Sequence, residues 1–225
     1  MQQALHTLTR VADTIDRRTG PAGELALRRD GEHYEIIANG VFLMDTRGGC
    51  SERLLITAAA ERMPAGEPML IAGLGVGFSL RAALDHLAVG SVVVVEREPA
   101  VIEWNRGPLR SQHADALTDP RVTCVRADFL AWLSQSDDRF GAICLDIDNG
   151  PEWTVSPENA ELYTETGLAS LARRLVPGGV LAVWSAAASE TFAARLRAVF
   201  DNVEALPVQV PRGEPDVVYL GYPPR

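Results

Sequence analysis

From residue 68 to residue 200 the chain alternates between short apolar segments and segments with helical spacing. The apolar segments predict strands over 68–73, 91–96, 121–126, 140–146 and 179–185. The other segments predict helices over 77–88, 99–106, 128–135, 158–175 and 189–200. This order predicts a parallel sheet that helices cover on both faces.

The last part of the chain departs from this alternation. The segments "NVEALPVQV" and "DVVYLGY", joined by a turn around Arg212-Gly213-Glu214, predict an antiparallel hairpin without a helix between its strands. A parallel sheet that ends in such a hairpin is typical of S-adenosylmethionine-dependent transferases. We therefore predict an α/β, Rossmann-like fold of the class I methyltransferase type, with a seven-stranded, mostly parallel sheet.

Residues 1–50 predict a small separate unit. Apolar residues at helical spacing over 4–18 predict an amphipathic helix that ends before Gly20-Pro21. Three strands follow, with turns at Asp30-Gly31 and Asn39-Gly40, and they predict a small antiparallel unit. A helix in "ERLLITAAAERM" then opens the second domain, so we expect domains at 1–50 and 51–225.

Composition excludes several classes of function. The 225 residues are 47% hydrophobic and 23% charged, which fits an ordinary globular protein with a sizeable core. The apolar runs are far shorter than the roughly 18 residues of a membrane span, and the first residues lack a signal-peptide layout. Three cysteines without CxxC spacing fit a reducing cytoplasm and argue against zinc. A net charge of −9 opposes nucleic-acid binding, so we expect a cytoplasmic protein whose partner is a small molecule.

Three glycines, Gly73, Gly75 and Gly77, stand between the first predicted core strand and its helix. Glycines there let the backbone approach a ligand closely, and the helix offers free N–H groups at its start. The G-x-G-x-x-G dinucleotide fingerprint would need glycine at Phe78, so the match is incomplete. The loop therefore predicts either nucleoside binding or a tight turn with a structural role only.

Two acidic residues follow the next strands. Glu96 ends the second strand, 19 residues after Gly77, where a carboxylate can accept hydrogen bonds from both ribose hydroxyls. The alternative for Glu96 is a solvated loop charge. Asp128 comes just after the third strand and can hold an adenine amino group, cap the following helix, or do both.

The segment "LDIDNGPEW" gathers polar residues at the end of the fourth strand. In open α/β sheets this end of the strand borders the ligand crevice, so Asp146 can deprotonate or orient a nucleophilic amine or hydroxyl. Asp148 is a second catalytic candidate, although its direction beyond the strand is open. Trp153, and Trp184 at the end of the fifth strand, are candidate walls of an acceptor pocket; the alternative is a strand cap and core tryptophans.

The two aspartates of this segment also raise the alternative of a metal centre. Asp-x-Asp after the fourth strand resembles metal-dependent catechol-type O-methyltransferases. Those enzymes need a further Asp-Asn ligand after the next strand region, and "GGVLAVWSAAASE" has none. We therefore expect no metal.

Together, the segments "IAGLGVGFSLRAAL", "VVVVERE", "ADFLAWL", "ICLDIDNGP" and "PGGVLAVW" resemble the spermidine synthase family. This family is the aminopropyltransferase branch of the S-adenosylmethionine transferase fold, and the resemblance covers about residues 24–222. It implies that Glu96 binds ribose, Asp128 binds adenine and Asp146 binds the attacking amine. It also implies that the N-terminal strands contribute to a homodimer.

The chain departs from the family pattern at three places. The glycine loop has Val76 where aminopropyltransferases carry an aspartate that holds the ammonium of the donor. The catalytic loop, D-[ST]-[ST]-D-P in the family, reads "DIDN" here and ends in Asn149, so the second acid has become an amide or has moved by one position. A Tyr-Gln pair is replaced by Cys50-Ser51, although Glu52 remains as a pocket residue.

These departures decide the expected reaction. Losing one partner of a buried charge pair costs about 2–5 kcal/mol. From Val76 we therefore expect S-adenosylmethionine as the donor and methyl transfer to a small amine or hydroxyl, with the net negative charge favouring a cationic acceptor. Aminopropyl transfer from decarboxylated S-adenosylmethionine is the alternative, and a non-catalytic nucleoside binder is a third reading.

Overall fold

The computed structural model describes residues 12–210 and 213–224. Its contacts divide the chain into two compact units, Met1–Gly48 and Gly49–Arg225, and each is described by itself. Within the described residues, no helix is long and apolar enough to cross a membrane.

The first unit is a four-stranded antiparallel sheet in the order β1-β2-β3-β4. Its strands are β1 (Asp13–Gly20), β2 (Gly23–Asp30), β3 (His33–Ala38) and β4 (Val41–Asp45). The predicted turn at Asn39-Gly40 is confirmed, and both residues have a positive φ (51° and 81°), as a two-residue hairpin turn requires.

The predicted helix over 4–18 is wrong where the structure describes it. Residues 13–18 belong to β1, which pairs with β2 from Asp13 opposite Arg29 to Gly20 opposite Gly23. The tight turn between Gly20 and Gly23 brings the two segments together, so ladder hydrogen bonds override the weak helical pattern. Residues 4–11 of the predicted helix lie outside the described residues.

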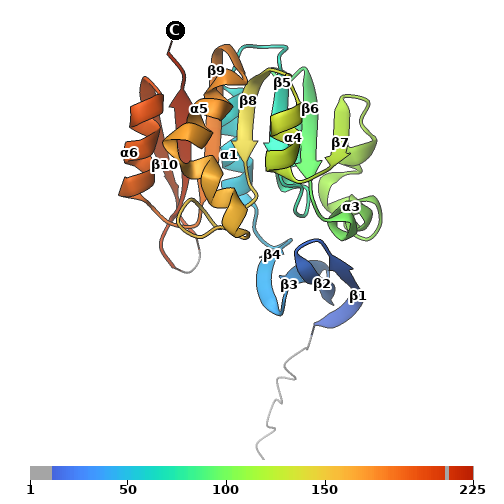
Figure 1. Ribbon diagram of the computed structural model, residues 1–225. Coiled ribbons are helices and arrows are strands. Elements are labelled where there is room, and N and C mark those ends of the chain that lie inside the picture. The colour runs from blue at the N-terminus through green and yellow to red at the C-terminus, as the bar shows by residue number, and fades with distance from the viewer. Residues whose placement is uncertain (1–11, 211–212, 225) are drawn as a thin grey trace, which may run out of the picture. The chain divides into compact units, whose positions relative to one another are not determined.

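The second unit contains a seven-stranded sheet in the order β10-β11-β9-β8-β5-β6-β7 (Figure 1). Its strands are β5 (Pro68–Ala72), β6 (Ser91–Glu96), β7 (Val122–Arg126), β8 (Phe140–Leu145), β9 (Leu175–Ser185), β10 (Asn202–Val208) and β11 (Asp216–Tyr222). Strands β5 to β9 pair in parallel, whereas β11 is antiparallel to both β9 and β10. The predicted seven-stranded, mostly parallel sheet with a C-terminal hairpin is confirmed.

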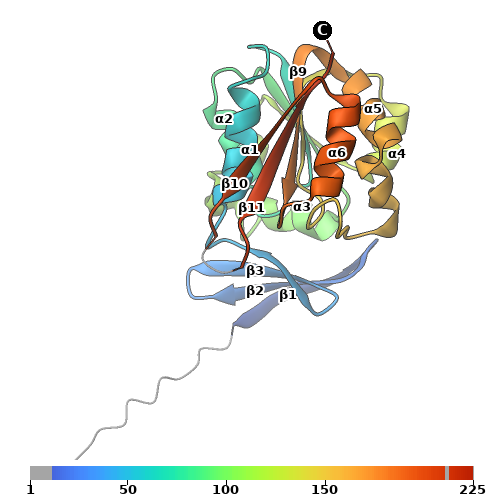
Figure 2. The same cartoon turned by 90° about the vertical axis from the view of Figure 1, so that its left-hand side faces the viewer.

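Helices cover both faces of this sheet (Figure 2). One face carries α1 (Cys50–Ala60) and α2 (Phe78–Asp85), and the other carries α4 (Phe129–Gln135), α5 (Glu165–Arg173) and α6 (Glu190–Val199). The remaining α-helix, α3 (Pro99–Arg106), follows β6. The segment predicted as one helix over 158–175 is a 3-10 helix, Pro157–Tyr163, followed by α5, because Thr164 caps α5 by accepting a hydrogen bond from the Gly167 N–H.

The central strands β5 and β8 form the buried middle of the sheet. All six residues of β8 are buried, as are four of the five residues of β5. On the face of α5 and α6, the ring of Phe192 packs edge-on against Tyr163 and Tyr219, with ring centroids 5.8 and 5.2 Å apart. Such aromatic pairs add about 0.5–1.5 kcal/mol each beyond the burial itself, so the 3-10 helix and α6 are firmly attached.

The order of the strands determines where a ligand can bind. The chain runs outward from β5 through β6 to β7 and then returns to β8 on the other side of β5. In open α/β sheets, such a reversal leaves a crevice at the carboxyl ends of the two central strands. The residues directly after β5 and β8 therefore border the candidate site.

Candidate functional site

The glycine loop after β5 adopts a left-handed backbone at all three glycines. The φ angles of Gly73, Gly75 and Gly77 are 93°, 52° and 88°. A Cβ at Gly73 would lie 2.4 Å from the carbonyl oxygen of Asp146, and one at Gly77 would lie 2.5 Å from the His113 ring. Close packing inside the protein thus requires two of the glycines, whether or not a ligand is bound.

Glu96 connects the end of β6 to the glycine loop. Its Oε2 accepts a hydrogen bond from the Leu74 N–H (2.9 Å), and its Oε1 accepts one from the Glu98 N–H (2.7 Å). Burial raises the pKa of this carboxyl, although the two N–H groups oppose that shift. Because a carboxylate has about four acceptor positions, each oxygen keeps capacity for a ligand hydroxyl.

Asp128 caps α4, which is one of the two roles that the sequence predicts for it. Its Oδ1 accepts a hydrogen bond from the Ala131 N–H at 3.0 Å, and its Oδ2 lies 3.9 Å from Nη1 of Arg97. The side chain is 41% exposed, so the cap leaves one side of the carboxylate open to a ligand.

Asp146 is held at the carboxyl end of β8, beside the glycine loop. Its N–H donates to the Ala72 carbonyl (3.0 Å), which fixes its backbone next to β5. Its Oδ2 accepts a hydrogen bond from the Ser79 hydroxyl at 2.8 Å. Burial, and then the nearby Glu52 carboxylate, raise the pKa of Asp146 to about 8, against the opposing effect of the Ser79 hydroxyl.

Glu52 and Asp146 together form an acidic pair at the crevice. Glu52 lies in the first turn of α1, which packs against β8 and β9, and its Oε2 accepts a hydrogen bond from the Ser51 hydroxyl at 3.1 Å. The Glu52 carboxylate disfavours the ionised form of Asp146, and a cation near both groups relieves that repulsion. The acidic pair therefore suits a positively charged ligand or a transferred proton.

Asp148 has a different environment from Asp146. It is only 7% exposed, and its Oδ1 accepts hydrogen bonds from the Val155 N–H (2.6 Å) and the Asn159 amide (3.0 Å). Its Oδ2 accepts from the Tyr163 hydroxyl at 2.8 Å. The protein's own donors thus occupy both oxygens, and this geometry favours support of the loop over the catalytic role proposed from sequence.

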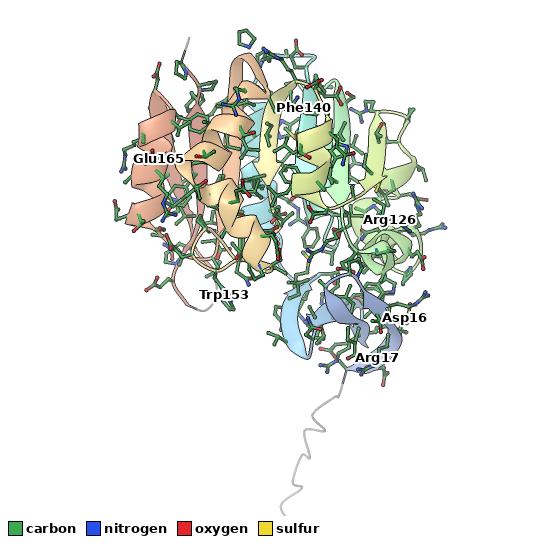
Figure 3. The ribbon with its side chains drawn as sticks, in the orientation of Figure 1. Asp16, Arg17, Arg126, Phe140, Trp153 and Glu165 are labelled. Atoms are coloured by element: carbon green, nitrogen blue, oxygen red, sulfur yellow. The ribbon has the colours of Figure 1, made fainter. Side chains whose placement is uncertain are left out.

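The other candidate pocket residues are spread over the surface and the end of β9. Trp153 lies on the surface of the loop after β8 and is 65% exposed, so it is not the wall of a closed pocket in this structure (Figure 3). The backbone carbonyl of Asn149 accepts a hydrogen bond from the Ala186 N–H at 3.0 Å, which joins the loop to the end of β9. Trp184 is part of β9, and its buried indole N–H has no hydrogen-bond partner among the described residues.

Sequence reasoning missed three residues that organise the site. Ser79 contacts Asp146, and Asn159 and Tyr163 contact Asp148. Ser79 could have been found because it is the second residue of the helix that the glycine loop opens. Asn159 and Tyr163 carry no comparable signal, because only tertiary packing brings them to the loop.

Across residues 12–210 and 213–224, the structure contains no group of three or more His, Cys, Asp or Glu side chains that could hold a metal ion. The acidic pair alone provides too few ligands for a magnesium or zinc centre without the substrate.

The switch-point crevice, the glycine loop and the strand-end carboxylates define a domain of the class I methyltransferase fold. Residues 51–211 match the family model of the spermine/spermidine synthase domain, and the chain belongs to this family. Over 165 residues it is 30% identical to a polyamine aminopropyltransferase of Mycobacterium tuberculosis; the match covers 71% of this chain and 30% of that protein. The chain therefore spans less than a third of the length of this curated relative.

Two solved structures are similar in fold. The spermidine synthase of Thermotoga maritima superimposes with a TM-score of 0.75 at 18% identity, covering 93% of this chain and 72% of that one. A spermidine synthase in complex with the transition-state analogue AdoDATO superimposes with a TM-score of 0.74, also at 18% identity and with the same coverage. At this identity, the likeness establishes the fold.

The expected methyltransferase activity is wrong for this family, since the curated relatives are polyamine aminopropyltransferases. The expectation rested on Val76, which replaces an aspartate of the glycine loop. In the structure the Val76 side chain is wholly buried (0% exposed), so it does not line an open crevice. Val76 alone therefore does not support S-adenosylmethionine as the donor.

Proposed function

We propose that this protein transfers an aminopropyl group from decarboxylated S-adenosylmethionine to a cationic small-molecule amine. The observation that carries the proposal is the acidic pair, Glu52 and Asp146, at the switch point of the sheet. Two carboxylates there favour ligands with ammonium groups, both on the donor and on the acceptor. The names of the relatives point to the same chemistry.

The donor fits the residues around the crevice. The carboxylate of Glu96 has free acceptor capacity for the ribose hydroxyls, and the open side of Asp128 can accept from an adenine amino group. Gly73 and Gly75 have no side chains, so the backbone of the loop can approach the donor closely at these two positions. When bound, the donor supplies a carbon atom made electrophilic by the neighbouring sulfonium.

Asp146 is suited to accept a proton from the attacking amine. The amine nitrogen forms a bond to the electrophilic carbon, the carbon–sulfur bond breaks, and its electron pair remains on sulfur as a neutral thioether. The proton that the nitrogen loses goes to Asp146. A carboxyl with a pKa of about 8 binds a proton more tightly than an ordinary aspartate, so its ionised form, which a cationic ligand stabilises, is the better base.

The test uses mass spectrometry of reaction mixtures with purified protein. Decarboxylated S-adenosylmethionine and S-adenosylmethionine are each supplied with a panel of short-chain diamines and monoamines. We expect an aminopropylated amine and an equal amount of methylthioadenosine from the decarboxylated donor. Asp146→Asn should abolish product, whereas Asp119→Asn, which alters a half-buried carboxylate paired with Arg121, should retain it. A methylated amine, or no thioether with any acceptor, would refute the proposal.

A further inference from the structure

Ser79 occupies a buried position between the glycine loop and Asp146. It is the second residue of α2, directly after the loop, and is 3% exposed. Its hydroxyl donates to Oδ2 of Asp146 at 2.8 Å. Among the described residues, this is the one hydrogen bond that the Asp146 carboxylate receives.

We propose that Ser79 is a positioning residue that holds Oδ2 of Asp146, so that Oδ1 is left to take the proton from the acceptor amine. The inference rests on the proposed aminopropyl transfer, in which Asp146 is the base. The backbone of Asp146 is already fixed by its hydrogen bond to Ala72 and by contact with Gly73. The Ser79 hydroxyl removes the remaining freedom, which is rotation of the carboxylate.

None of the other described groups that face Asp146 stabilises its ionised form. Glu52 on α1 repels the ionised carboxylate, and burial raises the pKa of the Cys144 thiol on β8 and of the Tyr163 hydroxyl, so both stay neutral. Neither residue donates a hydrogen bond to Asp146 in the structure. Ser79 is thus the group that stabilises the ionised form and fixes its direction.

The experiment compares Ser79→Ala and Ser79→Thr with the wild type in two measurements. The first is the pH profile of kcat and KM for aminopropyl transfer. The second is the titration of the Asp146 carboxyl in the ligand-free protein by carbon NMR, with Asp146→Asn used to assign the signal. The matched control is Ser185→Ala, because Ser185 is also buried (4% exposed) but its hydroxyl donates to the Ala187 carbonyl.

Ser79→Ala should lower kcat about tenfold with donor KM nearly unchanged, since one hydrogen bond to a charged group is lost. The same loss should raise the pKa of Asp146 by about one unit, both in the pH profile and in the titration. Ser79→Thr, which keeps the hydroxyl, should restore most of the activity, and Ser185→Ala should leave both pH midpoints in place. If Ser79→Ala does not fold, Ser79→Cys keeps a weaker donor at similar volume and should show a smaller change in the same direction.

An unshifted Asp146 titration in Ser79→Ala would overturn the inference by itself, as would an equal shift in Ser185→Ala. The titration does not depend on turnover. A wild-type protein that transfers no aminopropyl group would refute the proposed function, whereas the titration would still decide whether Ser79 controls Asp146.

Discussion

Removing the Asp148 carboxylate should destabilise the second unit rather than act on catalysis alone. Asp148→Ala leaves three donors without their acceptor: the Val155 N–H, the Asn159 amide and the Tyr163 hydroxyl. Val155 is 43% exposed, so water can replace the bond to its N–H, but Asn159 and Tyr163 are 7% and 1% exposed. A buried donor left without a partner costs about 1–3 kcal/mol, so the free energy of unfolding should fall by about 3 kcal/mol.

Urea unfolding followed by tryptophan fluorescence measures this change, because all four tryptophans belong to the second unit. Asp138→Ala is the control, since Asp138 is an exposed residue that accepts from the Ser136 hydroxyl, and its effect should stay within about 0.5 kcal/mol. Tyr163→Phe should lose about 1 kcal/mol in the wild type but much less in Asp148→Ala, because the two changes remove the same bond. A stable Asp148→Ala protein without turnover would show that Asp148 is catalytic and that the loop does not depend on it.

Two further outcomes follow from the strand-end carboxylates. Glu96→Ala should weaken donor binding, measured by calorimetry, by at least about thirtyfold. The substitution removes both the proposed ribose contact and the acceptor for the Leu74 and Glu98 N–H groups. Unchanged binding would show that Glu96 is not part of the donor site. The folded-state pKa of Asp146 is raised from 3.8 to about 8, so its stabilising effect is complete below pH 3.8 and is lost as the pH rises to about 8. The free energy of unfolding of the ligand-free wild type should therefore fall over this range relative to Asp146→Asn, and parallel pH curves for the two proteins would contradict the raised pKa.

Much of the fold could be predicted from the sequence because the core strands are apolar and regularly spaced. Strand β6 has its predicted bounds, 91–96, and helix α3 has its predicted bounds, 99–106. The N-terminal helix was wrong because a local helical pattern carries little energy against pairing with a neighbouring strand. The break at Thr164 was missed for a related reason, since a single threonine cap can divide an otherwise continuous helical pattern.

The same distinction between local sequence pattern and tertiary contact applies to the residues of the candidate site. A residue directly after a parallel strand borders the crevice because of the strand order alone, and this is why Glu96 and Asp146 could be placed from sequence. Beyond the strand end, side-chain direction depends on tertiary contacts. Asp148 accepts hydrogen bonds from Tyr163 and Asn159, which are 15 and 11 residues away in sequence, and its catalytic role stays a prediction.

Val76 shows the limit of transferring a motif position by position. The resemblance to the family motif implies an acidic residue at this position, but the Val76 side chain is fully buried here and does not line an open crevice. The proposed preference for a cationic ligand rests instead on Glu52 and Asp146, which lie far apart in the sequence and come near each other because α1 packs against β8. The charge of the substrate is therefore better inferred from the carboxylates that lie near each other in the fold than from the residues that match a family motif.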